Sequence, residues 1–205
     1  MDKTGAKKVN GNGGQGGGEG EPAGPGKGKH PTVTGVKPVH KGRKFDLEVL
    51  TVAYPSGKTH QREVIRHPGA VVVVPILPDG RIVLVNVFRI SLGRMCVECC
   101  AGTMDRGEKP RACAKRELAE ETGYKPGKLI DLEPFYTSPG MSDELMHPFV
   151  AKKLEHVGQH LEEDEDIEVL EVKPKALWKM VRKGEIRDGK SLLALHLARE
   201  AGYLD

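Results

Sequence analysis

The sequence of 205 residues lacks any apolar run near the roughly 20 residues that a membrane-spanning helix needs. Its first residues, MDKTGAKKVNGNGG, lack the apolar centre of a signal peptide. The net charge of +3 is too small to argue for nucleic acid as a partner. We therefore expect a cytoplasmic protein that binds neither membrane nor nucleic acid.

Cysteine is scarce, and its placement argues against zinc. Cys96 and Cys99 form a C-x2-C pair, but structural zinc needs a second pair of ligands at a suitable spacing. Cys100 adjoins the first pair, and Cys113 falls within a predicted helix. We expect four free thiols that pack as small apolar side chains.

Glycine is concentrated at one end of the chain. Residues 1–42 hold 13 of the 26 glycines, and such a segment buries too little apolar surface to offset its ordering entropy. We expect a flexible, mildly basic tail over residues 1–42 and one domain over residues 43–205. A role of the tail in binding an anionic partner stays open beside that of a solubilising extension.

The rest of the chain predicts an α+β domain with a mixed or antiparallel sheet. Apolar runs such as GAVVVVPIL indicate buried strands, and Pro55-Ser56-Gly57 indicates a turn between two more. Pro110 and Gly123 are typical of the first turn and the end of a helix over residues 109–122. Strands are expected near residues 44–53, 58–67, 69–77, 81–90, 129–138, 146–154 and 167–172, and helices at 173–185 and 190–202.

Three glutamates crowd one face of the helix at 109–122. Glu117, Glu120 and Glu121 are spaced i, i+3 and i+4, so their like charges repel. A hard divalent cation such as Mg²⁺ removes that conflict and bridges to substrate phosphates, while Arg116 can fix one carboxylate by a bidentate pair. The alternative for the glutamates alone is a solvated helix face.

These glutamates belong to a wider set at fixed spacing: Gly102, Glu108, Arg116, Glu117, Leu118, Glu120, Glu121 and Gly123. This set resembles the Nudix box, the signature of the Nudix hydrolase family. The family usually has an aliphatic residue at the final position, where this chain has Tyr124. The resemblance implies an α/β/α sandwich around a mixed sheet. It also implies hydrolysis of a nucleoside diphosphate linked to another group, with Mg²⁺ or Mn²⁺.

The resemblance also assigns roles within the box. Glu117 and Glu121 match the main metal ligands, and Glu120 matches a further ligand or a residue that holds water. The backbone carbonyl of Ala101 matches an additional ligand. Glu108 matches an acid that shares a metal or forms a salt bridge with Arg116, and Glu98, just before the box, matches a metal-proximal acid.

Residues outside the box resemble the ADP-ribose pyrophosphatase subgroup. Pro139, 15 positions beyond Tyr124, matches the proline that marks the subgroup, although a plain turn has the same appearance. By resemblance Glu144 binds a ribose of the substrate. Arg62 and Glu63 match positions near the adenine that a dimer partner often contributes.

Two further assignments come from the same resemblance. Arg89 matches a contact to the diphosphate or the terminal ribose, although Val87-Phe88 replaces the usual Gln-Tyr before it. Glu163, in the acidic stretch before the strand at 167–172, matches the general base. Its neighbours Glu162, Asp164, Glu165 and Asp166 are alternatives within a slip of a few positions.

The sequence thus predicts a cytoplasmic homodimer that converts ADP-ribose and water to AMP and ribose 5-phosphate with Mg²⁺. Two alternatives remain. One is a Nudix hydrolase for another small-molecule nucleotide, such as GDP-mannose, NADH, a diadenosine polyphosphate or an oxidised nucleotide. The other is a non-catalytic ADP-ribose sensor, against which the complete set of box carboxylates argues.

Overall fold

A computed structural model describes residues 29–161 and 166–205 of the chain. Its helices are α1 (Pro110–Thr122), α2 (Pro174–Lys183) and α3 (Gly189–Glu200). Its strands are β1 (Thr32–Lys41), β2 (Asp46–Ala53), β3 (Thr59–Arg66), β4 (Ala70–Pro75), β5 (Ile82–Arg89), β6 (Arg94–Glu98), β7 (Cys100–Thr103), β8 (Tyr124–Asp131), β9 (Phe135–Tyr136), β10 (Leu145–His156) and β11 (Ile167–Val172).

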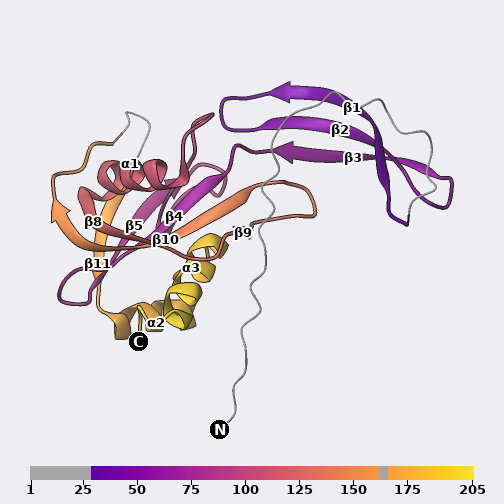
Figure 1. Ribbon diagram of the computed structural model, residues 1–205. Coiled ribbons are helices and arrows are strands. Elements are labelled where there is room, and N and C mark those ends of the chain that lie inside the picture. Colours follow the sequence, from indigo (N-terminus) through magenta and orange to yellow (C-terminus); the bar gives the residue numbers. More distant parts are fainter. Residues whose placement is uncertain (1–28, 162–165) are drawn as a thin grey trace, which may run out of the picture.

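The centre of the molecule is a mixed sheet between helices. Its strand order is β7-β4-β10-β8, with β9 added on β10, and β4 runs parallel to β10 but antiparallel to β7. Helix α1 covers one face, and α2 and α3 cover the other (Figure 1). This arrangement confirms the expected α+β class and the α/β/α sandwich.

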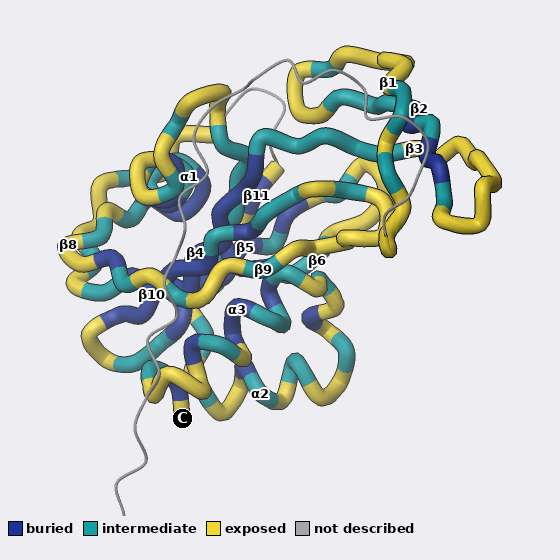
Figure 2. Tube along the Cα trace, turned by 45° about the vertical axis from the view of Figure 1, so that its right-hand side comes forward, coloured by how far each residue is buried: buried dark blue, intermediate teal, exposed yellow. Residues whose placement is uncertain are grey.

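Strand β4 is buried on both faces because each face packs on a different helix layer. Val71 and Val73 lie in the cluster that contains the buried residues of α1. Val72 and Val74 lie in the cluster that contains residues of α2 and α3. Side chains alternate across a strand, so the continuous apolar run fills both cores. Figure 2 shows β4 within the dark blue interior.

A second, antiparallel sheet has the order β11-β5-β6. Strand β5 pairs with β11 from Ile82↔Val172 to Val87↔Ile167, and with β6 as far as Arg89↔Arg94. Strands β6 and β7 were not expected from the sequence, since RMCVE and CAGT are too short and irregular to give a clear two-residue period. These two strands connect the second sheet to the glycine-rich start of the box.

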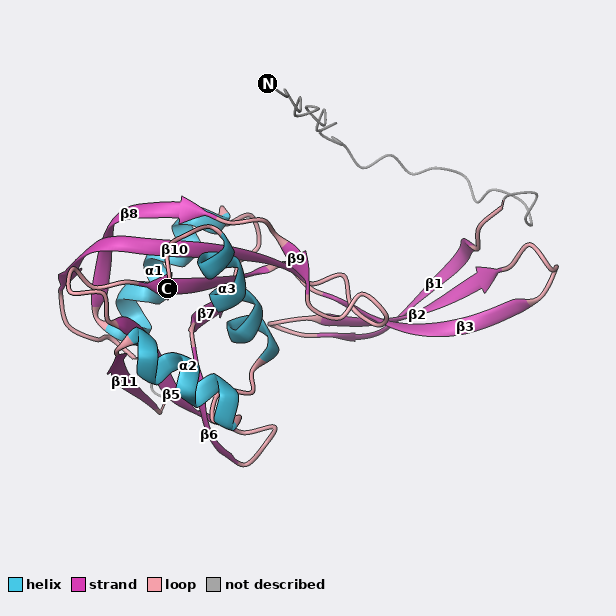
Figure 3. Cartoon of the chain, turned by 90° about the horizontal axis from the view of Figure 1, so that it is seen from below, coloured by secondary structure: helices cyan, strands magenta, loops and turns pink. Residues whose placement is uncertain are grey.

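The third sheet, β1-β2-β3, corrects the predicted start of order. Strand β1 lies inside the segment that was expected to be a flexible tail, and it pairs with β2 from Thr32↔Ala53 to Lys41↔Asp46. The glycine count of residues 1–42 concealed this strand, because the glycines concentrate before its β-branched run. Figure 3 shows the three-stranded sheet, hereafter the arm, projecting away from the sandwich.

Helix α1 begins and ends as its sequence indicates. Pro110 is in its first turn, and Gly123 has a left-handed φ of 72° that ends the helix. A Cβ at this glycine would lie 2.9 Å from the backbone of Gly158, so the position also requires the absence of a side chain. Within the described parts of the chain, no helix is long and apolar enough to cross a membrane.

Candidate active site

A polar cleft of about 510 Å³ lies where α1 faces β4 and β7. Acidic and basic side chains line it together, the acids mainly from α1 and the bases from several elements. Its charged lining residues are Arg43, Lys44, Arg89, Asp105, Arg106, Arg116, Glu117, Glu120, Glu121, Glu144 and Lys190. A cleft with both signs of charge suits a cation-bound anionic ligand.

The three helix carboxylates differ in their exposure to solvent. Glu121 is 7% exposed and its Oε2 accepts a hydrogen bond from the Ala101 N–H at 3.1 Å. The Glu117 side chain is 12% exposed, whereas that of Glu120 is 41% exposed. The helical spacing therefore points all three into one cleft, with Glu120 nearest to bulk solvent.

Arg116 links these carboxylates to Glu108. Its Nη1 donates to Glu117 Oε1 at 2.7 Å and to Glu120 Oε2 at 3.1 Å. Its Nε and Nη2 donate to the two carboxylate oxygens of Glu108 at 3.2 and 3.0 Å. The hydrogen bond from Arg116 holds the pKa of Glu108 below its ordinary value, and burial opposes that effect. Of the two roles that the resemblance implies for Glu108, the structure shows the salt bridge to Arg116.

Gly102 leaves room for the Glu117 carboxylate. A Cβ added at Gly102 would lie 1.9 Å from Glu117 Cδ and 2.0 Å from its Oε1. Such distances are far below van der Waals contact, so a side chain here and Glu117 in its present place exclude each other. The glycine of the box is thus explained by close approach of a carboxylate to the backbone.

The chemistry of the helix carboxylates fits a hard divalent cation. Carboxylate and carbonyl oxygens are the ligands that Mg²⁺ and Mn²⁺ prefer, and Glu117, Glu120, Glu121 and Ala101 all line the cleft. Among the described residues, no three acidic, histidine or cysteine side chains are already gathered around one point as metal ligands. Their oxygens instead contact Arg116 and the Ala101 amide.

Arg89 and Lys190, hereafter the cationic wall, both pair with the buried carboxylate of Glu98, and Lys190 also pairs with Asp188 at 2.9 Å. Arg89 donates to both carboxylate oxygens of Glu98 at 2.8 and 2.7 Å, and Lys190 forms a short ion pair with the same group. Burial alone would raise the pKa of Glu98, but the two cations outweigh it and lower that pKa. In this structure the carboxylate of Glu98 therefore forms an ion pair with Arg89.

Lys190 was missed from the sequence. It stands in the first turn of α3, where the N-cap Asp188 accepts a hydrogen bond from the Ser191 N–H at 3.0 Å. The D-x-x-S spacing of Asp188 and Ser191 indicates the start of a helix. It gives no sign that Lys190, which lies between them, contacts Glu98, 92 positions earlier in the chain.

The remaining predicted residues fall into three groups. Glu144 lines the cleft, and its carboxylate accepts a hydrogen bond from Thr137 and lies 3.8 Å from His67 Nε2. Arg62 and Glu63 lie exposed on β3 of the arm; where the structure describes the chain, they are not part of the cleft lining. Glu163, the predicted general base, lies outside the described residues.

The cysteines near the cleft are buried free thiols. Cys99 is 1% exposed and Cys100 is fully buried. Burial raises the pKa of Cys99 to about 12, and it also raises the pKa values of Cys100 and Cys113. The thiolate is the reactive form, so burial and the raised pKa values both disfavour reaction at these thiols.

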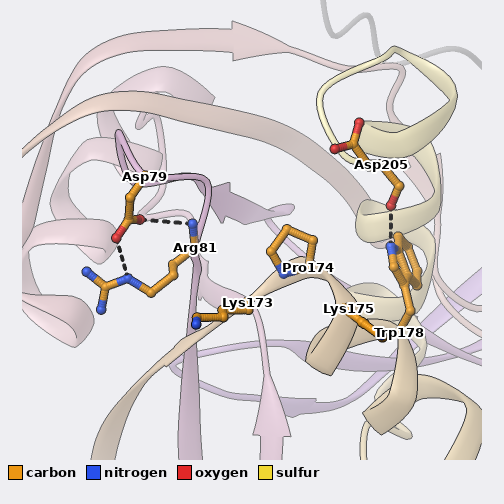
Figure 4. Close-up of a pocket in the computed structure, with 7 residues that line it drawn as sticks. All are labelled: Asp79, Arg81, Lys173, Pro174, Lys175, Trp178 and Asp205. Carbon is orange, nitrogen blue, oxygen red and sulfur yellow. Dashed lines mark hydrogen bonds and ion pairs between the residues drawn. The ribbon is translucent and has the colours of Figure 1, made fainter.

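A second cavity, of about 650 Å³, lies between the β4–β5 turn, α2 and the C-terminal residue. Figure 4 shows two interactions among its lining residues, Asp79 with Arg81 and Trp178 with Asp205. Arg81 pairs with Asp79 at 2.6 Å and with Glu171, and Trp178 Nε1 donates to the Asp205 carbonyl at 2.5 Å. The carboxylate cleft, which gathers more charged side chains of both signs, is the better candidate for an active site.

The fold and the cleft together define a class of protein. A mixed sheet lies between helices, and one helix carries carboxylates opposite cationic side chains, as in cation-dependent enzymes that act on phosphates. The NUDIX domain model matches residues 66–195, which include the whole cleft except Arg43 and Lys44. The chain belongs to the NUDIX hydrolase family.

Several curated proteins are similar over most of their length. An ADP-ribose pyrophosphatase of Bacillus subtilis (strain 168) is 42% identical over 159 residues, which cover 77% of this chain and 86% of that protein. A methanol dehydrogenase activator of Bacillus methanolicus is 39% identical over the same shares of the two chains. A GDP-mannose pyrophosphatase of Escherichia coli (strain K12) is 36% identical, covering 71% and 81%.

A solved structure, described as that of an ADP compounds hydrolase, matches with a TM-score of 0.74. It covers 85% of this chain and 97% of the other at 23% identity, and at that level it supports the fold. The expected sandwich is thereby confirmed by shape as well as by sequence.

Proposed function

We propose that this protein hydrolyses the diphosphate bond of ADP-ribose, giving AMP and ribose 5-phosphate. One observation carries the proposal: a cationic wall of Arg89 and Lys190 shares one cleft with the helix carboxylates Glu117, Glu120 and Glu121. A diphosphate bound together with divalent cations would have the charges to contact both the helix carboxylates and the cationic wall. The similar ADP-ribose pyrophosphatase supports the choice of substrate.

The helix carboxylates and the Ala101 carbonyl would hold Mg²⁺ or Mn²⁺. When bound, such a cation neutralises diphosphate charge and activates the attacking water for reaction at phosphorus. The protein side chains supply orientation. Arg116 holds Glu117 and Glu120 from one side, and the Ala101 N–H holds Glu121.

The chain's own residues also bind the substrate and accept the proton. Arg89 contacts the phosphate oxygens, for which a guanidinium is suited, and Glu144 accepts hydrogen bonds from ribose hydroxyls. Water adds to one phosphorus, the bridging P–O bond breaks, and the proton of the water passes to a general base. We assign that base to Glu163 or an acidic neighbour between residues 162 and 166.

A homodimer completes this proposal. Strand β1 is the edge of the arm, and Val33, Val36 and Val39 on it are 49%, 54% and 53% exposed. Exposed apolar side chains on an unpaired edge strand favour pairing with a second chain. A partner's arm would bring Arg62 and Glu63 to the adenine end of the substrate. The cytoplasmic location expected from the sequence remains a prediction.

GDP-mannose hydrolysis is the second candidate, because a similar curated protein has that name. The deciding experiment incubates the purified full chain with Mg²⁺ and ADP-ribose, GDP-mannose, NADH or a diadenosine polyphosphate, and separates the products by chromatography. We expect AMP and ribose 5-phosphate to form fastest. Faster release of GMP and mannose 1-phosphate would overturn the substrate assignment.

The carboxylate role is tested with Glu117→Gln in the same assay. Loss of a charged ligand should lower kcat on the order of 1,000-fold, comparable to the loss of a group that stabilises transition-state charge. Glu200→Gln, an exposed change in the last turn of α3, is the matched control and should retain wild-type turnover. Full activity of Glu117→Gln would refute the site. Tight ADP-ribose binding without turnover by wild type would revive the sensor alternative.

A further inference from the structure

The C-terminal end of α1 is held by the connection between β10 and β11. The Val157 N–H donates to the Gly123 carbonyl at 2.8 Å, and the His160 N–H donates to the Glu120 carbonyl at 3.0 Å. Between them, Gln159 Nε2 donates to the Glu121 carbonyl at 2.6 Å. Carbonyls in the last turn of a helix have no partner within the helix, so residues 157–160 act as its cap.

Gln159 also binds a second element. The same Nε2 donates to the Ile167 carbonyl at 3.2 Å. Ile167 is the first residue of β11 and pairs with Val87 of β5, two positions before Arg89. One side-chain amide therefore joins the helix that carries the carboxylates to the sheet that carries the cationic wall.

The contact at the helix end leaves no free space. A Cβ at Gly123 would approach both Gly158 C and Gln159 N to 2.9 Å, so the two segments lie backbone to backbone. The carbonyls that accept from His160 and Gln159 belong to Glu120 and Glu121, whose side chains line the cleft. A shift of residues 157–160 would therefore move the backbone of two proposed metal ligands.

We propose that Gln159 is a positioning residue for the reaction: by donating to the Glu121 and Ile167 carbonyls, it fixes the carboxylates of α1 relative to Arg89. Gln159 does not belong to the described residues that line the cleft, so it acts on the reaction indirectly. The inference rests on the proposed function for its catalytic meaning. Its structural meaning, that Gln159 fixes the end of α1, stands apart from the identity of the substrate.

The test compares two substitutions of opposite hydrogen-bonding capacity. Gln159→Glu retains the shape but presents only acceptors at neutral pH, so both carbonyls repel it. Gln159→Lys retains a donor and adds a positive charge that is favourable at a helix C-terminus. Gln159 is exposed at the surface, so both variants should fold. Glu200→Gln, which changes one charge at an exposed position at the end of α3, is the control.

Three readouts separate positioning from substrate contact and from general damage. We expect Gln159→Glu to lower kcat about tenfold and to weaken Mn²⁺ binding, measured by calorimetry without substrate, by a similar factor. The KM for ADP-ribose should stay within about twofold, because a positioning residue acts through the catalytic groups. Amide exchange at Val157, His160 and Gly123 should accelerate. Gln159→Lys and Glu200→Gln should resemble wild type.

The remaining outcomes overturn the proposal. Wild-type kcat and Mn²⁺ affinity in Gln159→Glu would show that the amide positions nothing. An equal loss in the glutamate and lysine variants would remove the donor role, and a rise in KM alone would indicate substrate contact. If the wild-type protein fails to hydrolyse ADP-ribose, the proposed function fails, but Mn²⁺ binding and amide exchange still decide the role of Gln159.

Discussion

Helix α1 is packed into the core of the molecule, whereas the arm extends away from that core. The helix packs Cys113, Ala114 and Leu118 into the core beneath β4, so its carboxylates project from a fixed base. The arm projects from the sandwich, and most residues of its edge strand β1 are exposed. The cation-binding part of the proposed chemistry therefore depends on one chain alone. In the proposed dimer, Arg62 and Glu63 of one chain would contact the adenine in the cleft of the other.

Apart from loss of a helix carboxylate itself, Gly102→Ala should produce the largest change at the helix side of this comparison. The new methyl group would take the space of the Glu117 carboxylate and displace it, since the backbone of β7 is held by its pairing with β4. A misplaced ligand should lower kcat about a hundredfold while the melting temperature changes little. Steady-state kinetics and calorimetry measure the two effects.

Gly35→Ala is the control on the arm. A Cβ there would meet Thr51 at 3.5 Å, an ordinary contact, so activity should stay at the wild-type level. Equal activity of Gly102→Ala and wild type would show that the close approach of Glu117 to the backbone has no catalytic importance.

Arg62→Ala should have a smaller effect of a different kind. If the arm of one chain serves the cleft of another, loss of Arg62 should raise the KM for ADP-ribose about tenfold and leave kcat within about twofold.

Val36→Lys, which places a charge on the exposed apolar side of β1, should shift the protein from dimer to monomer in light scattering. It should also reproduce the rise in KM.

The arm would lose this role under either of two results. A monomeric wild-type protein with full activity would leave Arg62 without a path to a cleft. A decrease in kcat without a change in KM for Arg62→Ala would assign the residue to folding or dynamics, which melting curves would detect.

The smallest expected effect concerns Tyr124, which follows the last glycine of the box. Its hydroxyl donates to Glu171 Oε1 at 2.6 Å, and this hydrogen bond, with burial, raises the pKa of Tyr124 from 10 to about 12. The fold therefore favours the neutral phenol. The stabilisation is complete below pH 10 and is lost as the pH rises from 10 to about 12.

Thermal unfolding of wild type and Tyr124→Phe over this range tests the effect. We expect the wild type to lose its small advantage in melting temperature between pH 10 and 12. A constant difference between the two proteins across the range would show that the Tyr124–Glu171 hydrogen bond is not coupled to folding.

Features that depend on local spacing were predictable from the sequence. Pro110 and Gly123 bound α1, and the i, i+3, i+4 spacing places three carboxylates in one cleft. The helices α2 and α3 were expected within one or two residues of their observed bounds. In each case the chain segment itself determines the result.

Features that depend on distant segments were missed. Strand β1 is defined by its pairing with β2, and Lys190 reaches Glu98 from the start of α3. Gln159 was not singled out either, because its two acceptor carbonyls lie 38 and 8 positions away. Spacing within one motif carries no information on such contacts, which arise only after the sheets and helices pack.

The two-sided burial of β4 also limits how this chain can change over generations. Val71 and Val73 belong to one core, and Val72 and Val74 belong to the other. Replacement of one small apolar residue by another changes the packing of only one layer, and that change is small. Insertion or loss of a single residue would exchange the contents of both layers and shift Gly69 and Pro75 out of their places. Descendants of this chain can therefore vary which small apolar residues form β4, but they cannot vary the length of the strand.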